Sequence, residues 1–422
     1  MRQQILFLSQ CLPYPPHSGV TNRTYHVLLQ LQRRFDVTLV AFSRRNHQAD
    51  HTARANSTSA LRAELSRVLD SVPIASEWSL AKKIQIHFES VMARKPYIFF
   101  DYASRQFGKE IETALHDNTF DLVHLDSLDV SGWLPLIPSV PITCTHHSIE
   151  SELLRLRATH IGNRLSAAYL NHQAKLLEAT ERALCGRFAL NVMTSELDAT
   201  RLRALVPRAN TASIPNGVDV NYFTPTESQR AVRGRVVFLG PTYMFPNRDG
   251  VEFFLSKIWP LILSDLPNVT FHLLGKNSHR DKTEFESNAG VTCHGYVDDI
   301  RPHFAAAQCS VVPLRTGGGT RLKILDAWAM GSAIVSTSIG CEGLAAVDGT
   351  NILIRDDPRQ FAEAVTAVLR DGELRRQLGE NGRKTAETIY AWSVVGDKLN
   401  GAYSALMRTD ASVNPKRLAV PR

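Results

Sequence analysis

Short apolar runs alternate with helical patterns along the chain, and this alternation constrains the fold more than any other feature. The first run, Gln4 to Leu8, is too short for a helix and is typical of a buried strand. After a proline-rich loop at 11–22, leucines recur with helical spacing, and residues 35–42 are predicted to form the next strand. A strand, a helix and a second strand in this order predict a parallel sheet covered by helices.

The alternation continues in two series, separated by a turn cluster at 215–219 and a polar stretch that reaches Arg235. The first series has predicted strands at 121–125, 141–145, 188–193 and 212–214, with helical patterns over 150–185 and much of 44–115. The second has predicted strands at 235–240, 269–274, 291–293, 309–313, 333–336 and 352–354, and helices at 247–263, 319–330, 358–370 and 374–387. The predicted fold class is therefore α/β, with two doubly wound domains at 1–214 and 231–391, a linker at 215–230, and a final segment at 392–422.

Composition and charge exclude several classes of protein. Hydrophobic residues make up 44% of the 422 residues and charged residues 21%, which excludes a disordered chain, a collagen and a coiled coil. Apolar runs stay well below the roughly 18 residues that span a bilayer. The formal net charge of +7 favours acidic partners, such as nucleotide phosphates or an anionic membrane face. Because Lys and Arg form no dense run, nucleic acid is not a predicted partner.

The six cysteines and the first residues of the chain indicate the expected compartment. The cysteines form no CxxC pair, and the chain is long and poor in cysteine, so they are predicted to be reduced core thiols. The apolar run that starts at Ile5 has only four residues, too few for a secretory signal. We therefore expect a cytoplasmic protein.

A glycine run between a strand and a helix is the strongest indication of a ligand site. Gly317, Gly318 and Gly319 follow a predicted strand, and Thr320 stands near the N-cap of a helix. The first N–H groups of a helix lack partners, and together with the helix dipole they favour an anion. Arg321 and Lys323 add positive charge in the first turn, where only a negative group would balance them. A phosphate or diphosphate is therefore predicted here, although two solvated cations beside a glycine-rich turn remain an alternative.

The spacing of this run also limits the kind of nucleotide site. It matches neither GxxxxGK[ST] nor GxGxxG, so a P-loop or a simple dinucleotide fold is disfavoured. Asp326 follows Lys323 by three residues and so lies on nearly the same helix face. Its carboxylate is predicted either to hydrogen-bond a ribose hydroxyl or to pair with Lys323.

An ordered set of motifs, most concentrated over 205–395, resembles the family 4 glycosyltransferases. The motifs are Pro215 to Asp219 with Phe223 and Pro225, Phe238-Leu239-Gly240, Phe271 to Gly275, Gly295 to Asp299, the helix Thr320 to Ala327, Gly340 to Leu344, and Tyr390 to Ser393. The glycine-rich helix is most similar to that of sugar transferases from bacterial exopolysaccharide gene clusters. The resemblance implies a retaining GT-B enzyme with two Rossmann-like domains that face each other across a cleft.

The family resemblance also implies an activity and assigns each substrate to one domain. It implies transfer of a sugar, with retention, from a nucleotide-sugar donor to a glycan or lipid-linked glycan, and neither a metal nor a cofactor is expected. The donor is expected mainly on the C-terminal domain and the acceptor on the N-terminal one, with a final helix at about 392–407 crossing back. The implied chemistry is front-face attack, in which the leaving phosphate takes the proton of the acceptor.

The chain departs from the family pattern at the donor site. The family's Glu-x7-Glu pair would fall at 318 and 326, where this chain has Gly318 and Asp326. The family's phosphate-binding Arg and Lys follow the first strand of the second domain, but here Gly240 is followed by a loop that reaches Arg248. Arg248 is therefore a partial substitute at best, and Arg321 and Lys323 are predicted to do most of the phosphate binding and catalysis.

Two further site predictions fall in the first half of the chain. Gly19 follows the first strand, where the family has a glycine-rich loop near the phosphates, although a surface turn is the alternative. His146-His147-Ser148-Ile149-Glu150 resembles the family's HNxE pattern and follows the strand at 141–145. His147 is the predicted catalytic residue, with His146 as the alternative, and a histidine held within the fold is the competing interpretation.

Acidic residues in the second half have open roles. Glu342, in a loop flanked by glycines, is predicted either to orient the donor sugar or to cap a turn. Asp298-Asp299 and Asp356-Asp357 stand at predicted helix starts, where Asp is favoured as a cap, so no metal site is predicted.

Fold alone does not fix function, and two rivals stay open. A nucleotide-sugar epimerase has the same architecture, and a non-catalytic sugar-nucleotide-binding protein would fit the loss of an acid at 318. Residues 150–187 carry arginines among leucines, so this segment is predicted either to rest on an anionic membrane face or to pack on the sheet.

Overall fold

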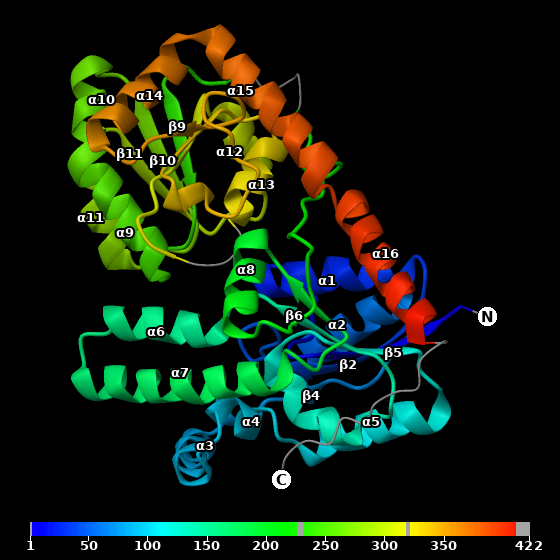
Figure 1. Cartoon of the computed structure of the whole chain (residues 1–422). Coiled ribbons are helices and arrows are strands. Elements are labelled where there is room, and N and C mark those ends of the chain that lie inside the picture. Colours follow the sequence, from blue (N-terminus) through cyan, green and yellow to red (C-terminus); the bar gives the residue numbers. More distant parts are fainter. Residues whose placement is uncertain (1, 226–230, 318–320, 411–422) are drawn as a thin grey trace. The chain divides into compact units, whose positions relative to one another are not determined.

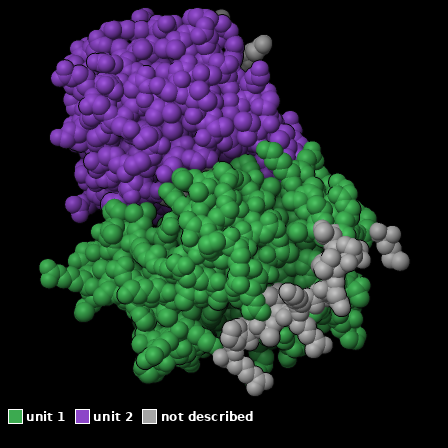
Figure 2. Space-filling model, in the orientation of Figure 1, with its two compact units in different colours: residues 1–215, 396–422 green, residues 216–395 purple. Residues whose placement is uncertain are grey.

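The computed structural model describes residues 2–225, 231–317 and 321–410 (Figure 1). The chain divides into two compact units, of which unit 1 contains residues 1–215 and 396–422 and unit 2 contains residues 216–395 (Figure 2). Each unit is built on its own parallel sheet, so the α/β fold class predicted from the alternation is confirmed. Within the described residues, no helix combines the length and apolar character needed to cross a membrane.

Unit 1 is a doubly wound sheet in the order β3-β2-β1-β5-β6-β7-β8, with all described pairs parallel. Its strands are β1 Gln4–Ser9, β2 Asp36–Ser43, β3 Arg67–Val68, β4 Val72–Pro73 (paired with β2), β5 Leu122–Leu125, β6 Ile142–His146, β7 Leu190–Met193 and β8 Thr211–Ser213. The longer strands lie within two residues of their predicted positions, because each is a short apolar run buried on both faces. The two-residue strands β3 and β4 give no such signal in the sequence.

The helices of unit 1 cover both faces of its sheet. They are α1 Gly19–Gln32, α2 His51–Glu64, α3 Leu80–Ala93, α4 Tyr97–Asp101, α5 Arg105–Asp117, α6 Glu150–His160, α7 Arg164–Leu184 and α8 Glu196–Leu205, together with the 3-10 segments η1 Ala75–Glu77 and η2 Leu128–Leu136. The helix α1 begins inside the loop predicted at 11–22, because Ser18 and Thr21 form a capping box there. The mostly polar helix α8 was not predicted.

Unit 2 has a six-stranded parallel sheet in the order β11-β10-β9-β12-β13-β14. The strands are β9 Arg235–Leu239, β10 Thr270–Leu274, β11 Val291–Gly295, β12 Cys309–Val312, β13 Ile334–Ser336 and β14 Leu353–Ile354. The helices are α9 Phe245–Phe253, α10 Trp259–Asp265, α11 His279–Glu286, α12 Arg301–Ala306, α13 Leu322–Ala329, α14 Pro358–Arg370 and α15 Gly372–Thr385, with a 3-10 turn η4 Ile339–Cys341 and π segments η3 Phe254–Ile258 and η5 Ala386–Tyr390. The predicted helix at 247–263 is thus interrupted by η3, next to Pro260, which has no N–H to donate.

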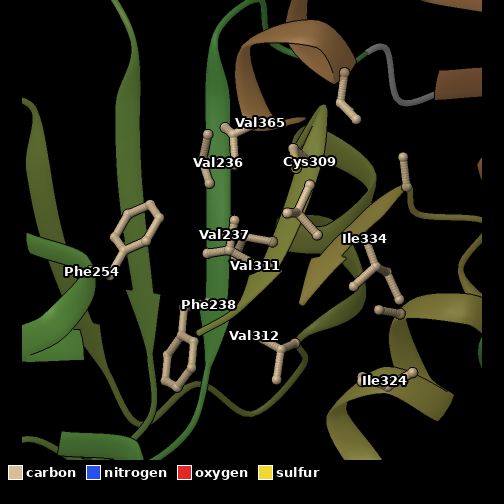
Figure 3. Packing of buried hydrophobic residues seen from close by; sticks show 14 of the residues in the cluster. Val236, Val237, Phe238, Phe254, Cys309, Val311, Val312, Ile324, Ile334 and Val365 are labelled. Carbon is tan, nitrogen blue, oxygen red and sulfur yellow. The ribbon is translucent and has the colours of Figure 1, made fainter. Parts of the chain in front are cut away.

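The core of unit 2 lies on both faces of the central strand β9. Val236, Val237 and Phe238 are all buried and belong to one cluster with Val311 of the neighbouring strand β12 and Ile334 of β13 (Figure 3). Aromatic rings extend this core under the helices: the centroids of Phe254 and Phe271 are 4.8 Å apart. All six cysteines are buried and free, as predicted for core thiols.

The last described helix, α16 Trp392–Asp410, passes from unit 2 into unit 1 at Gly396. Gly396 allows close approach, since a Cβ there would lie 2.4 Å from Oε1 of Gln30. Asn400 donates to the backbone oxygen of Gln30 at 3.0 Å, and the Tyr403 hydroxyl meets Nδ1 of His124 at 2.7 Å. The C-terminal helix therefore completes the packing of the first unit.

The glycines of α15 give a test of packing in unit 2. A Cβ on Gly379 would lie 2.2 Å from the backbone oxygen of Gly331, and a backbone atom cannot swing aside. We expect Gly379→Ala to lower the free energy of unfolding by about 1–3 kcal/mol, the usual cost of overpacking. Urea unfolding followed by circular dichroism would measure this. The matched control is Gly372→Ala in the same helix, where the added methyl meets only ordinary contacts; an equal loss in both variants would contradict the packing argument.

Candidate functional site

Both sheets have a topological switch point, where strand order reverses. In unit 2 the chain runs from β9 through β10 to β11 on one side, then returns to form β12 on the other side of β9. In unit 1 the same reversal lies between β1 and β5. Ligands of open parallel sheets bind outside the carboxyl ends of the strands at such points. The predicted site residues are therefore expected at these two places.

Three elements meet at the switch point of unit 2. Gly240 follows β9, and a Cβ on it would lie 2.8 Å from both Nζ of Lys323 and Nδ2 of Asn247. Lys323, in α13, donates a hydrogen bond of 2.7 Å to Oδ1 of Asn247, in α9. On its other side, Gly275 has a φ of +130° and leaves room for the Gly240 backbone. Glycine is therefore required at 240 for the lysine to reach the end of β9.

The charge of Lys323 is poorly compensated. Its ammonium lies 4.2 Å from the centroid of the Phe238 ring, and its hydrogen-bond acceptor is a neutral amide. Burial and the nearby Arg321 guanidinium lower the pKa of Lys323 to about 7. A negatively charged ligand would raise the pKa of Lys323 again, because it supplies the missing counter-charge. This is the electrostatic setting predicted for a phosphate.

Arg321 stands at the N-cap of α13, one residue after Thr320. It is buried, and its Nε and Nη2 donate to the backbone oxygen of Ile339 at 3.3 and 3.2 Å. Gly317 has a φ of +134°, and a Cβ there would lie 3.3 Å from Nη1 of Arg321. Gly317 thus lies close to the guanidinium. Gly318, Gly319 and Thr320 lie outside the described residues.

Asp326 lies one turn further along α13. Burial raises the pKa of its carboxyl to about 7. Among the described residues no ion pair joins it to Lys323, whose ammonium turns to Asn247 instead. The described residues therefore do not form the Lys323–Asp326 pair that was one of the two alternatives. Ribose binding by Asp326 stays a prediction.

Arg248 is occupied by carboxylates. Its guanidinium contacts Glu252 at 2.6 Å, Asp281 at 2.9 Å and Glu284 at 3.5 Å, which ties α9 to α11. The neighbouring Asn247 is the residue of this segment that meets Lys323. Sequence reasoning missed Asn247, although it directly precedes the arginine that was singled out. A phosphate-binding role for Arg248 stays a prediction.

The loop after β13 brings Glu342 close to the same strand ends. Glu342 is the C-cap of η4, and Gly343 after it has a φ of +78°. Gly340 lets the loop pack tightly, since a Cβ there would lie 2.5 Å from the backbone oxygen of Val312. Through the Ile339 oxygen this loop also holds Arg321. Glu342 thus ends a turn, and its predicted contact with a donor sugar is untested.

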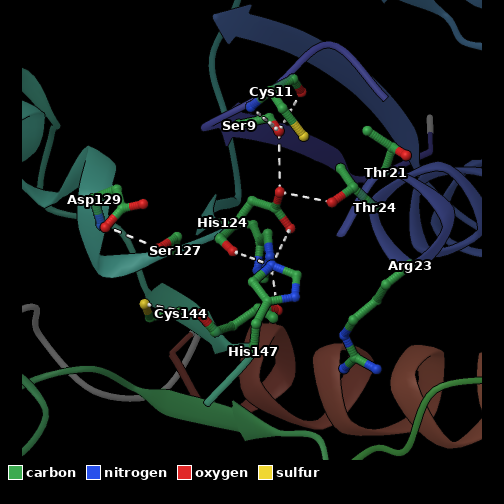
Figure 4. A network of polar contacts seen from close by, with 12 residues as sticks. Ser9, Cys11, Thr21, Arg23, Thr24, His124, Ser127, Asp129, Cys144 and His147 are labelled. Atoms are coloured by element: carbon green, nitrogen blue, oxygen red, sulfur yellow. Dashed lines mark hydrogen bonds and ion pairs between the residues drawn. The ribbon is translucent and has the colours of Figure 1, made fainter. Parts of the chain in front are cut away.

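In unit 1 a buried carboxylate occupies the switch point. Asp126 directly follows β5, and its Oδ2 accepts hydrogen bonds from Ser9 at 3.0 Å and Thr24 at 2.8 Å (Figure 4). Ser9 ends β1 and Thr24 lies in α1, so the carboxylate joins three elements. Burial raises its pKa to about 7. Sequence reasoning missed Asp126, although a polar residue after a central strand is a recognisable signal.

The two adjacent histidines have different surroundings. His146 is buried, and its Nε2 meets Oδ1 of Asn191 on β7 at 2.9 Å. His147 keeps 14% of its side chain exposed, and its Nε2 meets the backbone oxygen of Asp126 at 3.0 Å. A carbonyl only accepts, so Nε2 is assigned the proton and Nδ1 is an acceptor. Burial and the charge of Arg23 lower the pKa of His147 to about 3, so the ring is neutral. This supports His147 over His146 as the ligand-facing residue.

Gly19 is the first residue of α1. The N-cap before it is Ser18, whose side chain accepts from the N–H of Thr21. The serine that replaces one family glycine is therefore used to start the helix. The structure places Gly19 at the exposed N-terminus of a helix after β1, and its contact with a phosphate stays a prediction.

Two buried polar groups near this site also escaped prediction. Arg23 in α1 is almost fully buried and donates to the backbone oxygen of Ile214 at 2.8 Å. His124 on β5 meets Thr143 at 2.9 Å and Tyr403 at 2.7 Å. Tyr403 is 279 residues further along the chain, so no local pattern could have indicated this contact.

The acidic pairs act as helix caps or ion-pair partners. Asp357 caps α14 by accepting from the N–H groups of Arg359 and Gln360, and Asp299 pairs with Arg301 at 2.8 Å. In the part of the chain that the structure describes, no group of three His, Cys, Asp or Glu side chains could hold a metal ion.

Comparison with known proteins agrees with this geometry. The chain has the GT-B type of fold, two Rossmann-like domains of parallel sheet and helices. Residues 17–222 match the model of Glycosyltransferase Family 4, and residues 233–371 match that of Glycosyl transferases group 1. Two glycosyltransferase family models thus match successive parts of the chain.

Individual relatives match over part of their length. The lipopolysaccharide core biosynthesis glycosyltransferase LpsE of Rhizobium meliloti is 33% identical over 165 residues, which cover 36% of this chain and 45% of that protein. A GDP-mannose-dependent phosphatidylinositol monomannoside mannosyltransferase of Corynebacterium glutamicum is 24% identical over 44% of this chain and 54% of its own. The matched region thus spans about half the length of these curated relatives.

Solved structures match over nearly the whole chain. Sucrose-phosphate synthase from Thermosynechococcus elongatus aligns with a TM-score of 0.67 at 18% identity, over 97% of this chain and 100% of its own. HepE of Anabaena, solved with UDP and glucose, aligns with a TM-score of 0.64 at 15% identity, over 96% and 100%. At these identities the likeness concerns the fold.

The raised pKa of Asp126 predicts a pH-dependent stability. Its pKa is about 7 in the folded chain and about 3.9 when unfolded, so folding takes up a proton between these values. This contribution to stability is present below about pH 4 and is lost as pH rises to about 7. Asp126→Asn does not titrate, so its melting temperature, relative to the wild type, should rise between pH 5 and pH 8.

Differential scanning calorimetry across this pH range measures the effect. Asp397→Asn, an exposed carboxylate on α16, is the control and should show no such trend. A constant difference between Asp126→Asn and the wild type at all pH values would contradict the buried-carboxylate argument.

Proposed function

We propose that the protein is a retaining, metal-independent glycosyltransferase that works in the cytoplasm and needs no cofactor beyond its nucleotide-sugar substrate. The acceptor is a glycan or lipid-linked glycan, and the pathway is bacterial exopolysaccharide or other cell-surface polysaccharide synthesis. The observation that carries this proposal is the convergence of Gly240, Asn247, Lys323 and Arg321 at the switch point of a group 1 glycosyltransferase domain. Two relatives support it, a lipopolysaccharide core biosynthesis glycosyltransferase and a GDP-mannose-dependent mannosyltransferase.

The reaction sets the electrostatic requirement. Breaking the glycosyl–phosphate bond leaves negative charge on the nucleoside diphosphate and positive character on the sugar ring. Preorganised cations aimed at the leaving phosphate therefore lower the barrier, each by roughly 3–4 kcal/mol. In this proposal Lys323 and Arg321 supply these charges, and the N–H groups at the start of α13 add the helix dipole.

The roles of the other residues follow from their positions. Gly240 and Gly317 admit the diphosphate close to the backbone, and Asp326 binds a ribose hydroxyl. His147 offers its neutral Nδ1 as a hydrogen-bond acceptor for a sugar hydroxyl, while Asp126 holds the ring through its backbone oxygen. The leaving phosphate takes the proton of the acceptor as the new bond forms on the same face of the sugar.

The donor site is tested by thermal shift with UDP, GDP, ADP and CMP and their sugar conjugates. A ligand at 100 times its dissociation constant should stabilise the wild type by about 2.7 kcal/mol. We expect one nucleotide to do so, and Lys323→Met and Arg321→Met to lose most of the shift, because each removes a charge from the phosphate site. Lys257→Met, an exposed lysine of η3, is the control and should keep the full shift.

Three outcomes would count against the proposal. If no nucleotide shifted the wild type, the donor site would be refuted. If the nucleotide bound but the nucleotide sugar alone were converted to its epimer, the protein would be an isomerase. Transfer to an acceptor with inverted configuration, read by proton NMR, would refute retention.

The pKa of Lys323 predicts how donor affinity depends on pH. A nucleotide sugar keeps two fixed negative charges, so the groups that titrate belong to the protein: they are Lys323 and Asp326, each with a pKa of about 7, and Lys323 is the one that meets the phosphates. Below about pH 7 the ammonium is already charged, and affinity should be constant. Above about pH 7 binding must first restore the proton, so the affinity should fall by up to about tenfold per pH unit.

Isothermal titration calorimetry between pH 6 and 8.5 measures this profile, and buffers of different ionisation enthalpy report the proton uptake. Lys323→Arg keeps a permanent charge and should give a flat profile with no proton uptake. A falling profile in both proteins would assign the pH dependence to another group.

A further inference from the structure

The helix α3 turns a row of large apolar side chains to the solvent. Leu80, Ile84, Phe88, Val91 and Met92 are each between 41% and 74% exposed. Single exposed hydrophobic residues are normal on a protein surface, but five on one helix form a continuous patch. Their spacing of three and four residues places them on one face of the helix. We call this set of five residues the α3 apolar face.

The opposite side of α3 is the one held against unit 1, and it is held largely by polar contacts. Ser90 is buried, and its hydroxyl accepts from Nε2 of Gln173 in α7 at 2.8 Å. His87 meets the Tyr169 hydroxyl, also in α7, at 2.6 Å. Ile86 is the only buried large apolar residue of α3 within the described chain. The helix therefore has the reverse of the usual amphipathic arrangement, in which the apolar face packs inward.

Positive charge surrounds the α3 apolar face. The segment 79–95 carries Lys82, Lys83, Arg94 and Lys95 but a single acidic residue, Glu89. Trp78 is half exposed just before the helix, with the Arg45 guanidinium 4.9 Å from its ring centroid. Aromatic and aliphatic residues on one face, with lysines and arginines beside them, are the composition of helices that lie in the surface of an anionic membrane.

Two further exposed apolar residues lie at the turn between α6 and α7. Ile161 and Leu165, at the junction of α6 and α7, are 41% and 83% exposed. Leu165 precedes Tyr169 by one turn of α7, and Tyr169 contacts His87 of α3, so this part of α7 approaches α3. Between 153 and 167 all ionisable residues other than His160 are arginines, so the charge at this point has the same sign.

We propose that α3 is a membrane-docking helix, which lies in the headgroup region of an anionic phospholipid bilayer with the α3 apolar face toward the acyl chains. Lys82, Lys83, Arg94 and Lys95 then meet the lipid phosphates. This goes beyond the proposed function, because it requires neither donor nor transfer, and it would bring unit 1 to a lipid-linked acceptor.

The structure moves the membrane contact away from most of the segment 150–187. Leu154, Leu177 and Leu184 of that segment are buried in the core of unit 1. Arg155 and Arg182 both pair with Glu178, which neutralises part of its charge. Packing within unit 1, the alternative stated for these helices, therefore describes their buried leucines, while the α6–α7 turn is exposed.

Flotation of the full-length chain with lipid vesicles tests the proposal. The vesicles are pure phosphatidylcholine or a 7:3 mixture of phosphatidylcholine and phosphatidylglycerol, at 150 mM salt. We expect binding to the anionic vesicles and at least tenfold weaker binding to the neutral ones. Ile84→Ser/Phe88→Ser should reduce the binding at least tenfold, and Lys82→Gln/Lys83→Gln should reduce it and weaken its salt dependence.

The matched control replaces two exposed apolar residues of unit 2, as Leu261→Ser/Val347→Ser, and should bind like the wild type. Phosphatidylcholine brominated on its acyl chains, mixed into the anionic vesicles, provides a second readout. It should quench tryptophan fluorescence in the wild type and much less in Trp78→Phe. Circular dichroism and the nucleotide thermal shift, unchanged in every variant, show that the fold and the donor site are intact.

Three results would overturn the proposal. One is a wild type that fails to bind anionic vesicles. Another is binding that survives Ile84→Ser/Phe88→Ser. The third is a wild-type dimer in sedimentation velocity that this variant dissociates while vesicle binding is absent, which would make the α3 apolar face a protein interface. Failure here leaves the nucleotide thermal shift unaffected, so it is distinct from failure of the proposed transferase activity.

Discussion

The burial of one ammonium group is the constraint on which the candidate site of unit 2 depends. Lys323 lies against the Phe238 ring and donates a hydrogen bond to a neutral amide, and among the described residues no carboxylate pairs with its positive charge. Desolvating a charge is expensive unless something compensates for it. Gly240 must lack a side chain, Asn247 must present its oxygen, and α13 must begin at Arg321 for this arrangement to exist. A second cation nearby increases the imbalance, and an anionic ligand is the simplest way to relieve it.

Unit 1 also buries an ionisable group at its switch point, but this group is a carboxyl and not an ammonium. Asp126 is buried after a central strand and is held by two hydroxyl groups, and its pKa moves toward neutrality as that of Lys323 does. Both groups stand at the switch point of their sheet, where the diverging helices leave space at the strand ends. In each unit, then, a buried ionisable group with a shifted pKa lies at the position where parallel sheets bind ligands.

The sequence was most informative where burial decides the structure. Strands such as β1 and β9 are apolar runs covered on both faces, so their positions could be predicted within a residue or two. The glycine-rich turn and the two cations of α13 were also recognisable, because their chemistry is local. The start of α1 was missed because Ser18 and Thr21 form its cap, instead of the more familiar Ser and Glu. Asn247 and Asp126 acquire their importance only when strand order brings them to Lys323 and His147.

The chain leaves unit 1 at residue 215 and returns to it at 396, so unit 2 is an insertion in the first unit. Unit 2 is therefore synthesised as one continuous segment, whereas unit 1 is incomplete until its last helix has been synthesised. Until α16 arrives, His124 lacks the Tyr403 hydroxyl, and Gln30 lacks Asn400. Unit 1 is thus the first to be started and the last to be completed. Its first 215 residues must stay free of aggregation while the 180 residues of unit 2 are added.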